Sequence, residues 1–144
     1  MNFRKLIMIT LVTFFIATFP SWFISSNIDY LVKPFAISKI IFPIVWTILY
    51  LLMAIAFYLV VDSKKTWLIY FAQLIVNSLW TVIFFGLRWR LLAFIWLIIL
   101  ICLVGIMIYK FYQENKAAGY ILLPYMAWLI FAGYLNLTLY LLNR

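Results

Sequence analysis

Five long apolar segments constrain what this chain can fold into. They cover residues 6–25, 40–61, 66–85, 91–112 and 118–142, and the charged residues gather between them or at their ends, as Lys110 does. A helix that crosses the hydrocarbon core of a bilayer needs about 20 mostly apolar residues. Each segment is therefore predicted to be one transmembrane helix.

The composition excludes a soluble globular domain. Of the 144 residues, 70% are hydrophobic and 10% are charged, and the mean hydropathy is +1.20. Soluble domains are about 45–50% apolar and about 25% charged. The uninterrupted apolar runs also lack the alternating pattern of a membrane β-barrel. We predict an all-α, multi-pass integral membrane protein whose residues 1–144 form a single domain of five helices.

The basic residues are spread over all the connections between these segments. The net charge is +8, but no basic block is present, so we expect contacts with lipid phosphates and not with nucleic acid. The N-terminus with the second and fourth loops carries six Lys and Arg residues against five elsewhere, which does not set an orientation. Five spans place the termini on opposite faces, and only the first loop, of about 14 residues, is long enough to act as a lid.

The N-terminal residues, the single cysteine and the lack of histidine bear on three possible features: a signal peptide, a disulfide, and a metal or catalytic site. Arg4 and Lys5 before an apolar run resemble a signal peptide, but no clean small-x-small cleavage site follows, so the first segment is predicted to stay as a helix. Cys102 cannot form an internal disulfide. The chain has no histidine, and we predict no metal site and no catalytic residue.

Polar and aromatic side chains share one face of the third segment. Gln73, Asn77, Trp80 and Phe84 are spaced by four, three and four residues, which is helical spacing. Because amides inside a membrane need partners, this face is predicted to point into the bundle. One interpretation is that both amides do no more than hydrogen-bond neighbouring helices. We predict that role for Gln73 and a position in the pocket for Asn77.

Similar stripes occur on the second and fifth segments. Their members are Trp46, Tyr50, Ala54 and Phe57, and Tyr125, Trp128, Ala132 and Asn136. Helix packing accounts for such stripes equally well. Three helices that bring tryptophan together with small or amide side chains can also line a flat, aromatic-walled pocket.

Three motifs in this order resemble those of the TspO/MBR family, the tryptophan-rich sensory proteins and the mitochondrial translocator protein. They are residues 42–50 (FPIVWTILY), the pattern Gln73-x3-Asn77-x2-Trp80-x3-Phe84-Phe85, and residues 122–136 (LLPYMAWLIFAGYLN). The resemblance covers essentially the whole chain. The first loop departs from it: Lys33-Pro34 is present, but no tryptophan lies between Trp22 and Trp46 and the double proline is missing.

The resemblance implies a membrane receptor or sensor that binds porphyrin-like, flat hydrophobic ligands such as protoporphyrin IX and extends to their transport. It implies a pocket inside the bundle, beneath the first loop, and needs no cofactor. The implied ligand contacts are Trp46, Tyr50, Asn77, Trp80, Trp128 and Ala132, with Gln73, Phe84, Phe131 and Lys33 as further candidates. Lys33 and Lys39 lie where porphyrin carboxylates could reach them.

Other functions remain open at this stage. One is an enzyme that degrades bound porphyrin with light and oxygen; another is a structural membrane protein with a vestigial pocket. Leu137, Tyr140 and Arg144 fit a loose sterol-binding pattern that is more often an interfacial anchor. Homodimerisation is implied by the resemblance alone, because the chain has no Gly-x3-Gly pair.

Overall fold

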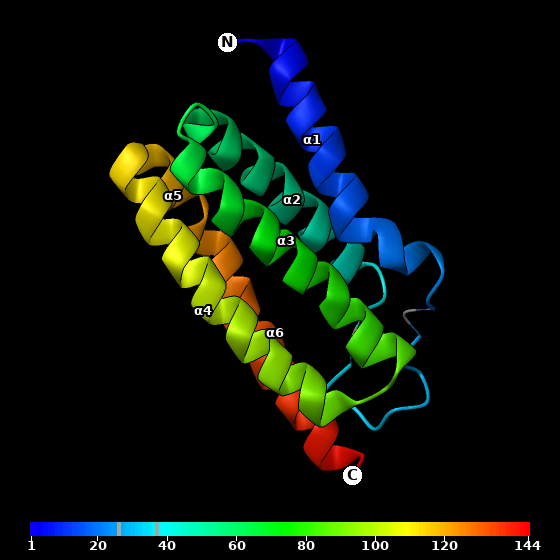
Figure 1. The fold of residues 1–144 in the computed structure, drawn as a ribbon. Helices are drawn as coiled ribbons and strands as arrows, with labels where there is room; N and C mark the ends of the chain where they lie inside the picture. The colour runs from blue at the N-terminus through cyan, green and yellow to red at the C-terminus, as the bar shows by residue number, and fades with distance from the viewer. Residues whose placement is uncertain (26, 37) are drawn as a thin grey trace.

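The structure, a computed structural model, describes residues 1–25, 27–36 and 38–144. Within these residues, five helical stretches are long and apolar enough to cross a membrane: Phe3–Trp22, Ile41–Val60, Lys64–Gly86, Arg90–Glu114 and Lys116–Leu142. The prediction of an all-α, multi-pass membrane bundle is confirmed (Figure 1).

Proline interrupts the first and the last of these stretches. Helix α1 (Phe3–Thr18) passes into a 3₁₀ turn, η1 (Phe19–Trp22), at Pro20. The first helical stretch, Phe3–Trp22, has the length of the predicted 6–25 but begins and ends three residues earlier. The last span consists of α5 (Lys116–Ile121) and α6 (Leu123–Leu142), with Pro124 in the first turn of α6. Proline has no amide hydrogen, so it tolerates a helix start but not a helix interior.

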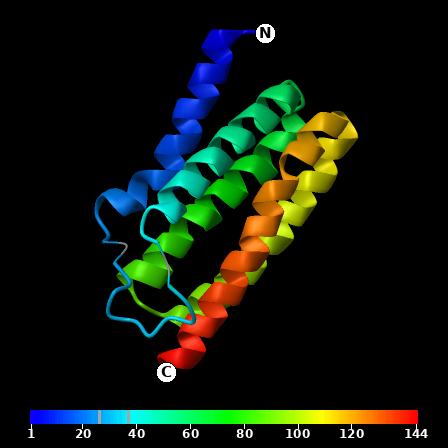
Figure 2. The same ribbon diagram turned by 180° about the vertical axis from the view of Figure 1, so that it is seen from behind.

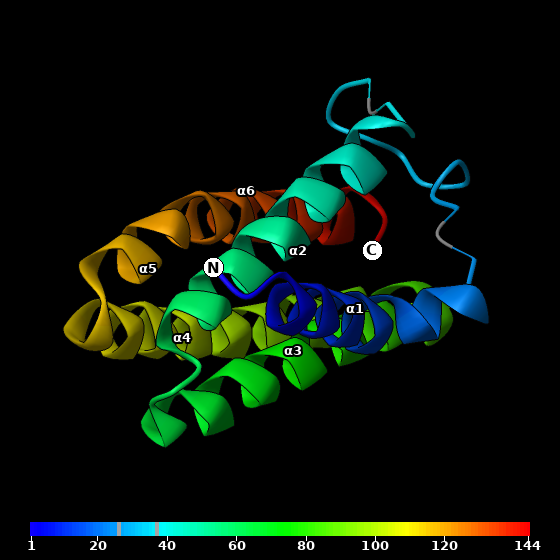
Figure 3. The same ribbon diagram turned by 90° about the horizontal axis from the view of Figure 1, so that it is seen from above.

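The three central spans form the rest of the bundle. They are α2 (Ile41–Val60), α3 (Trp67–Thr81) and α4 (Arg90–Glu114); a 3₁₀ turn, η2 (Lys64–Thr66), precedes α3, and a π-helical turn, η3 (Val82–Gly86), follows it. Helix α1 packs against α2 and α3, α4 packs against α3, α5 and α6, and α2 packs against α5. Figure 3 shows α2, α5 and α6 on one side and α1, α3 and α4 on the other.

The outer surface of the bundle is apolar. Leu68 is 81% exposed, Ile130 59% and Ile44 53%. Such a surface would cause aggregation in water, but it matches a lipid environment, where apolar side chains are the compatible exterior. Polar side chains concentrate inside: Thr13, Gln73, Asn77 and Asn136 are buried, among others. The fold is therefore built for a bilayer.

The loop between α1 and α2 is fastened across the end of the bundle where α6 ends (Figure 2). Asn143 donates to the Val32 carbonyl at 2.9 Å and accepts from the Val32 amide at 2.8 Å. Leu31 is buried, and the Arg88 guanidinium lies 4.6 Å from the centre of the Tyr30 ring. This segment is therefore anchored over the helix ends, although it has no tryptophan between Trp22 and Trp46 and no double proline.

We expect the two termini to be accessible from opposite sides of the membrane, since they lie at opposite ends of the bundle (Figure 1). Asn2→Cys and Arg144→Cys, each made in a Cys102→Ala background, should react with an impermeant maleimide from opposite faces of oriented vesicles. Labelling of both from the same face would contradict the five-span fold.

Asn143→Ala should release the first loop, because it removes both hydrogen bonds to Val32. We expect trypsin to cut after Lys39 several-fold faster in this variant than in the unchanged protein. Arg144→Gln is the matched control, since it alters the neighbouring residue but leaves the Asn143 contacts in place. Equal cleavage rates in all three proteins would show that Asn143 does not hold the loop.

Candidate functional site

Two amides of α3 meet a tyrosine of α6 in the centre of the bundle. The Tyr125 hydroxyl donates to Gln73 Oε1 at 2.8 Å, and Asn77 Nδ2 donates to the Tyr125 hydroxyl at 2.9 Å. All three side chains are buried. The predicted inward direction of this α3 face is confirmed for the two amides.

The structure does not separate the two amides as the sequence suggested. Asn77 is 3% exposed and bonds the same hydroxyl as Gln73, and neither residue belongs to the lining of the two grooves described below. Tyr125 also packs edge-on against Trp46, with 6.4 Å between ring centres. Asn77 can therefore act on a ligand from behind Tyr125, through the position of that ring and hydroxyl.

A second series of hydrogen bonds lies closer to the loop end of the bundle. Trp80 Nε1 donates to Asn136 Oδ1 at 3.1 Å, and Asn136 Nδ2 donates to the Arg90 carbonyl at 2.9 Å. Phe84, in the π-helical turn η3, stacks on Trp80 with ring centres 5.0 Å apart. The polar atom of Trp80 is thus engaged within the protein, and its ring forms a wall with Phe84.

Between α2 and α6 the surface opens into a groove of about 430 Å³, which we call the α2–α6 groove. Its lining is Val45, Ile48, Leu49, Leu52, Pro124, Ala127, Trp128 and Phe131. Of the residues predicted to contact ligand, Trp128 and Phe131 belong to this wall. The Trp128 ring lies 5.7 Å from Phe42 and 5.3 Å from Phe131. The groove is apolar with aromatic edges, as ligand sites commonly are.

The other predicted residues lie behind or beside this wall. Trp46 packs on the buried Tyr50, with 5.4 Å between ring centres. Ala132 is partly buried and packs against the same hydrophobic core as Trp46 and Trp128. The structure therefore brings Trp46, Tyr50, Trp128 and Ala132 around one core and places Phe84 in a second, while Trp80 packs against both.

The Trp128 indole N–H is the one unsatisfied polar group in this region. Among the residues that the structure describes, Trp128 Nε1 is the single fully buried side-chain nitrogen or oxygen without a hydrogen-bond partner. By contrast, Trp67, Trp80 and Trp96 each donate to an oxygen of the protein. A buried donor left unpaired costs about 1–3 kcal/mol, so a rotation of the Trp128 ring that turns this N–H toward a ligand acceptor in the groove would recover that energy.

The first loop contacts the α2–α6 groove through Phe35 and also carries a cluster of charged residues. Phe35 contacts Phe131, with 6.5 Å between ring centres. Lys39 Nζ bonds Asp29 Oδ2 at 2.6 Å, and Lys33 Nζ lies 3.5 Å from Asp29 Oδ1. The hydrogen bond from Lys39 holds the pKa of the Asp29 carboxyl below its ordinary value. One carboxylate thus balances two lysines, which leaves this cluster with a net positive charge.

Tyr125 and Asn136 are the polar residues that the sequence-based site omitted. Both belong to the stripe on the fifth segment, where helix packing was an equally good explanation. The signal that could have selected them is chemical: a tyrosine and an amide facing the amides and tryptophan of α3 inside a membrane must bond something, and those groups are the available partners.

Tyr125→Phe should destabilise the bundle by about 1–3 kcal/mol, because it leaves the buried Gln73 and Asn77 amides without their shared partner. SDS unfolding titrations in mixed micelles would measure this loss. Tyr134→Phe is the matched control: it lies on the same helix, but its side chain is 57% exposed. A loss no larger than that of the control would show that the hydrogen bonds do not support the fold.

Comparison with known proteins identifies the family. The model of the TspO/MBR family matches residues 6–141. The tryptophan-rich protein TspO of Archaeoglobus fulgidus is 37% identical over 103 residues, which cover 68% of this chain and 67% of that protein. The tryptophan-rich sensory protein of Cereibacter sphaeroides is 34% identical over 106 residues (72% and 67%), and the translocator protein homolog of Schizosaccharomyces pombe is 39% identical over 107 (68% and 65%). This membrane-spanning chain therefore belongs to the TspO/MBR family.

Proposed function

We propose that this protein is a membrane sensor or transporter that binds porphyrin-type macrocycles at the α2–α6 groove. The relatives named above are a sensory protein and a translocator homolog, which supports a role in ligand recognition or movement. The single observation that carries the proposal for this site is the unpaired, buried N–H of Trp128 on the wall of an aromatic groove.

The shape and chemistry of the groove favour a flat apolar ligand. Its volume of about 430 Å³ lies within the ~300–1,000 Å³ of small-molecule sites. Trp128 and Phe131 offer ring faces and edges to a conjugated macrocycle, and the small side chain of Ala127 leaves space for it in the groove. A polar substituent or ring nitrogen of the ligand supplies the acceptor that Trp128 lacks.

The loop supplies complementary charge. A porphyrin carries carboxylates at one edge, and the Asp29, Lys33 and Lys39 cluster has an excess of positive charge. Phe35 connects this loop to the groove through its contact with Phe131. The proposed orientation therefore places the macrocycle against Trp128 and its carboxylates toward the two lysines.

Titration of the purified protein in nanodiscs with protoporphyrin IX tests this function, with the shift of the porphyrin absorption band as the readout. We expect saturable binding with a dissociation constant of about 1 μM or weaker, because part of the binding energy is lost in ordering the groove and loop. Trp128→Phe should weaken binding about fivefold, since it keeps an aromatic ring but removes the hydrogen-bond donor.

Two further variants locate the ligand. Ala127→Phe fills the α2–α6 groove and should abolish the band shift, whereas Trp22→Phe, whose side chain lies away from this groove at the end of η1, should bind like the unchanged protein. Ala132→Phe tests the position implied by the family motif. If Ala132→Phe blocks binding but Ala127→Phe does not, the ligand lies inside the bundle and the groove assignment fails.

A further inference from the structure

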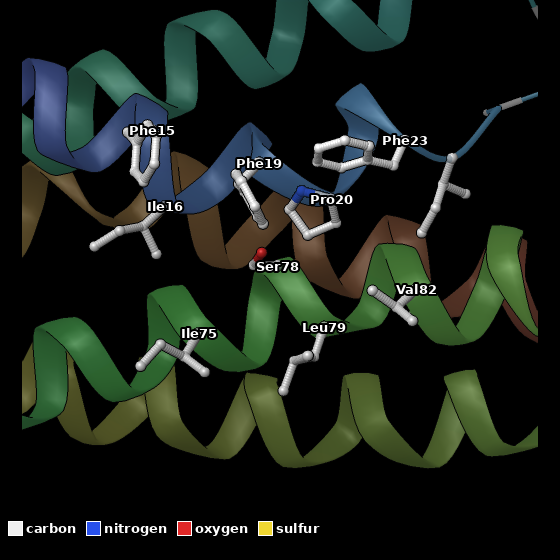
Figure 4. A pocket seen from close by; sticks show the side chains of 10 residues that line it. Phe15, Ile16, Phe19, Pro20, Phe23, Ile75, Ser78, Leu79 and Val82 are labelled. Carbon is white, nitrogen blue, oxygen red and sulfur yellow. The ribbon is translucent and has the colours of Figure 1, made fainter.

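A second groove lies on another wall of the bundle, between the first span and α3. This α1–α3 groove has a volume of about 500 Å³. Its walls include Phe19, Pro20 and Phe23 from the first span, and Ser78, Leu79 and Val82 from the third (Figure 4). It shares no lining residue with the α2–α6 groove, so it is a separate candidate site.

The α1–α3 groove contains one hydroxyl without a partner. Ser78 is 7% exposed, and its hydroxyl has no hydrogen-bond partner among the residues that the structure describes. Figure 4 shows the hydroxyl directed across the groove toward Phe19 and Pro20. Four threonines on the spans, Thr10, Thr18, Thr47 and Thr138, instead bond the carbonyl four residues earlier, and Thr13 bonds the Tyr70 hydroxyl.

The facing wall provides an unusual acceptor. In a regular helix the Ile16 carbonyl would accept from the amide of residue 20, but Pro20 has no amide hydrogen. Ile16 and Pro20 both line the groove. The two walls therefore offer a hydroxyl on α3 and, on the first span, a carbonyl that lacks its usual donor. A ligand hydroxyl can pair with the Ser78 hydroxyl, because each can donate one hydrogen bond and accept others.

The depth of Ser78 restricts the ligand further. Ser78 lies eight residues before Gly86, the end of the third span, which is about 12 Å along a helix. On the facing wall, Pro20 lies two residues before Trp22, the end of the first span. A charged headgroup inside a span is strongly unfavourable, so the polar group that meets Ser78 is expected to be uncharged. The rest of the groove is aromatic and branched aliphatic, which matches a hydrocarbon skeleton.

From these observations we propose that the α1–α3 groove binds an apolar lipid alcohol of the isoprenoid type, whose single hydroxyl pairs with the Ser78 hydroxyl inside the bilayer. The aromatic side chains of the first span hold the hydrocarbon part, and Ser78 selects for the oxygen. This site operates beside the proposed porphyrin site and does not depend on it.

Binding of radiolabelled farnesol to the full-length protein in nanodiscs tests the proposal, with empty nanodiscs as the blank. Unlabelled farnesene has the same skeleton without the hydroxyl, and cholesterol is a lipid alcohol with a rigid fused-ring skeleton in place of the flexible chain. We expect saturable binding that farnesol displaces about fivefold better than farnesene, as one hydrogen bond requires, and that cholesterol does not displace. The protoporphyrin titration on the same samples reports separately on the α2–α6 groove.

Three variants complete the experiment. Ser78→Ala should remove the preference for farnesol over farnesene, and Leu79→Trp should abolish saturable binding by filling the groove. Thr138→Ala, a hydroxyl deletion on α6, should leave binding unchanged. Absence of saturable binding to the unchanged protein, equal displacement by farnesol and farnesene, or displacement by cholesterol that depends on Ser78 would overturn the proposal. So would conversion of a dimer to a monomer by Leu79→Trp, since the groove would then be an interface between two copies.

Discussion

The absence of hydrogen-bonding solvent inside the bilayer is the constraint on which this structure depends. Every backbone amide and carbonyl must be paired within the protein, which makes helices the available element. The same constraint applies to side chains, and the Tyr125 hydroxyl meets it for Gln73 and Asn77 together. Helices α3 and α6 are therefore joined by hydrogen bonds as well as by packing, and these bonds fix which faces of the two helices meet.

Polar side-chain groups without a hydrogen-bond partner are candidate ligand contacts in such a protein. Where nearly all interior polar atoms are bonded, the Trp128 N–H and the Ser78 hydroxyl stand apart, and each lines a groove. The two grooves are open toward the lipid and lie on different walls. Hydrophobic ligands that partition into the bilayer can reach both without crossing water, which suits a protein that senses or moves such molecules.

The first loop lies across the end of the bundle and carries charged side chains there. Its middle is fastened by Asn143 and by the Arg88–Tyr30 contact, and Arg88 adopts a left-handed backbone conformation, with φ of 58°, that non-glycine residues rarely take. Beside this anchor, the lysines around Asp29 stay at the rim. The loop thus crosses the bundle end, contacts the α2–α6 groove through Phe35 and carries two lysines paired with Asp29.

The sequence by itself determined the membrane fold, the five spans and the inward face of Gln73 and Asn77, because length, apolarity and helical spacing are local properties of the chain. It also carried the family motifs. Only the tertiary structure decided which polar groups pair: that Tyr125 serves both amides, that Trp80 bonds Asn136, and that Trp128 Nε1 has no partner among the residues that the structure describes. A periodic pattern says which face a residue occupies, but partners and grooves depend on how distant helices approach one another.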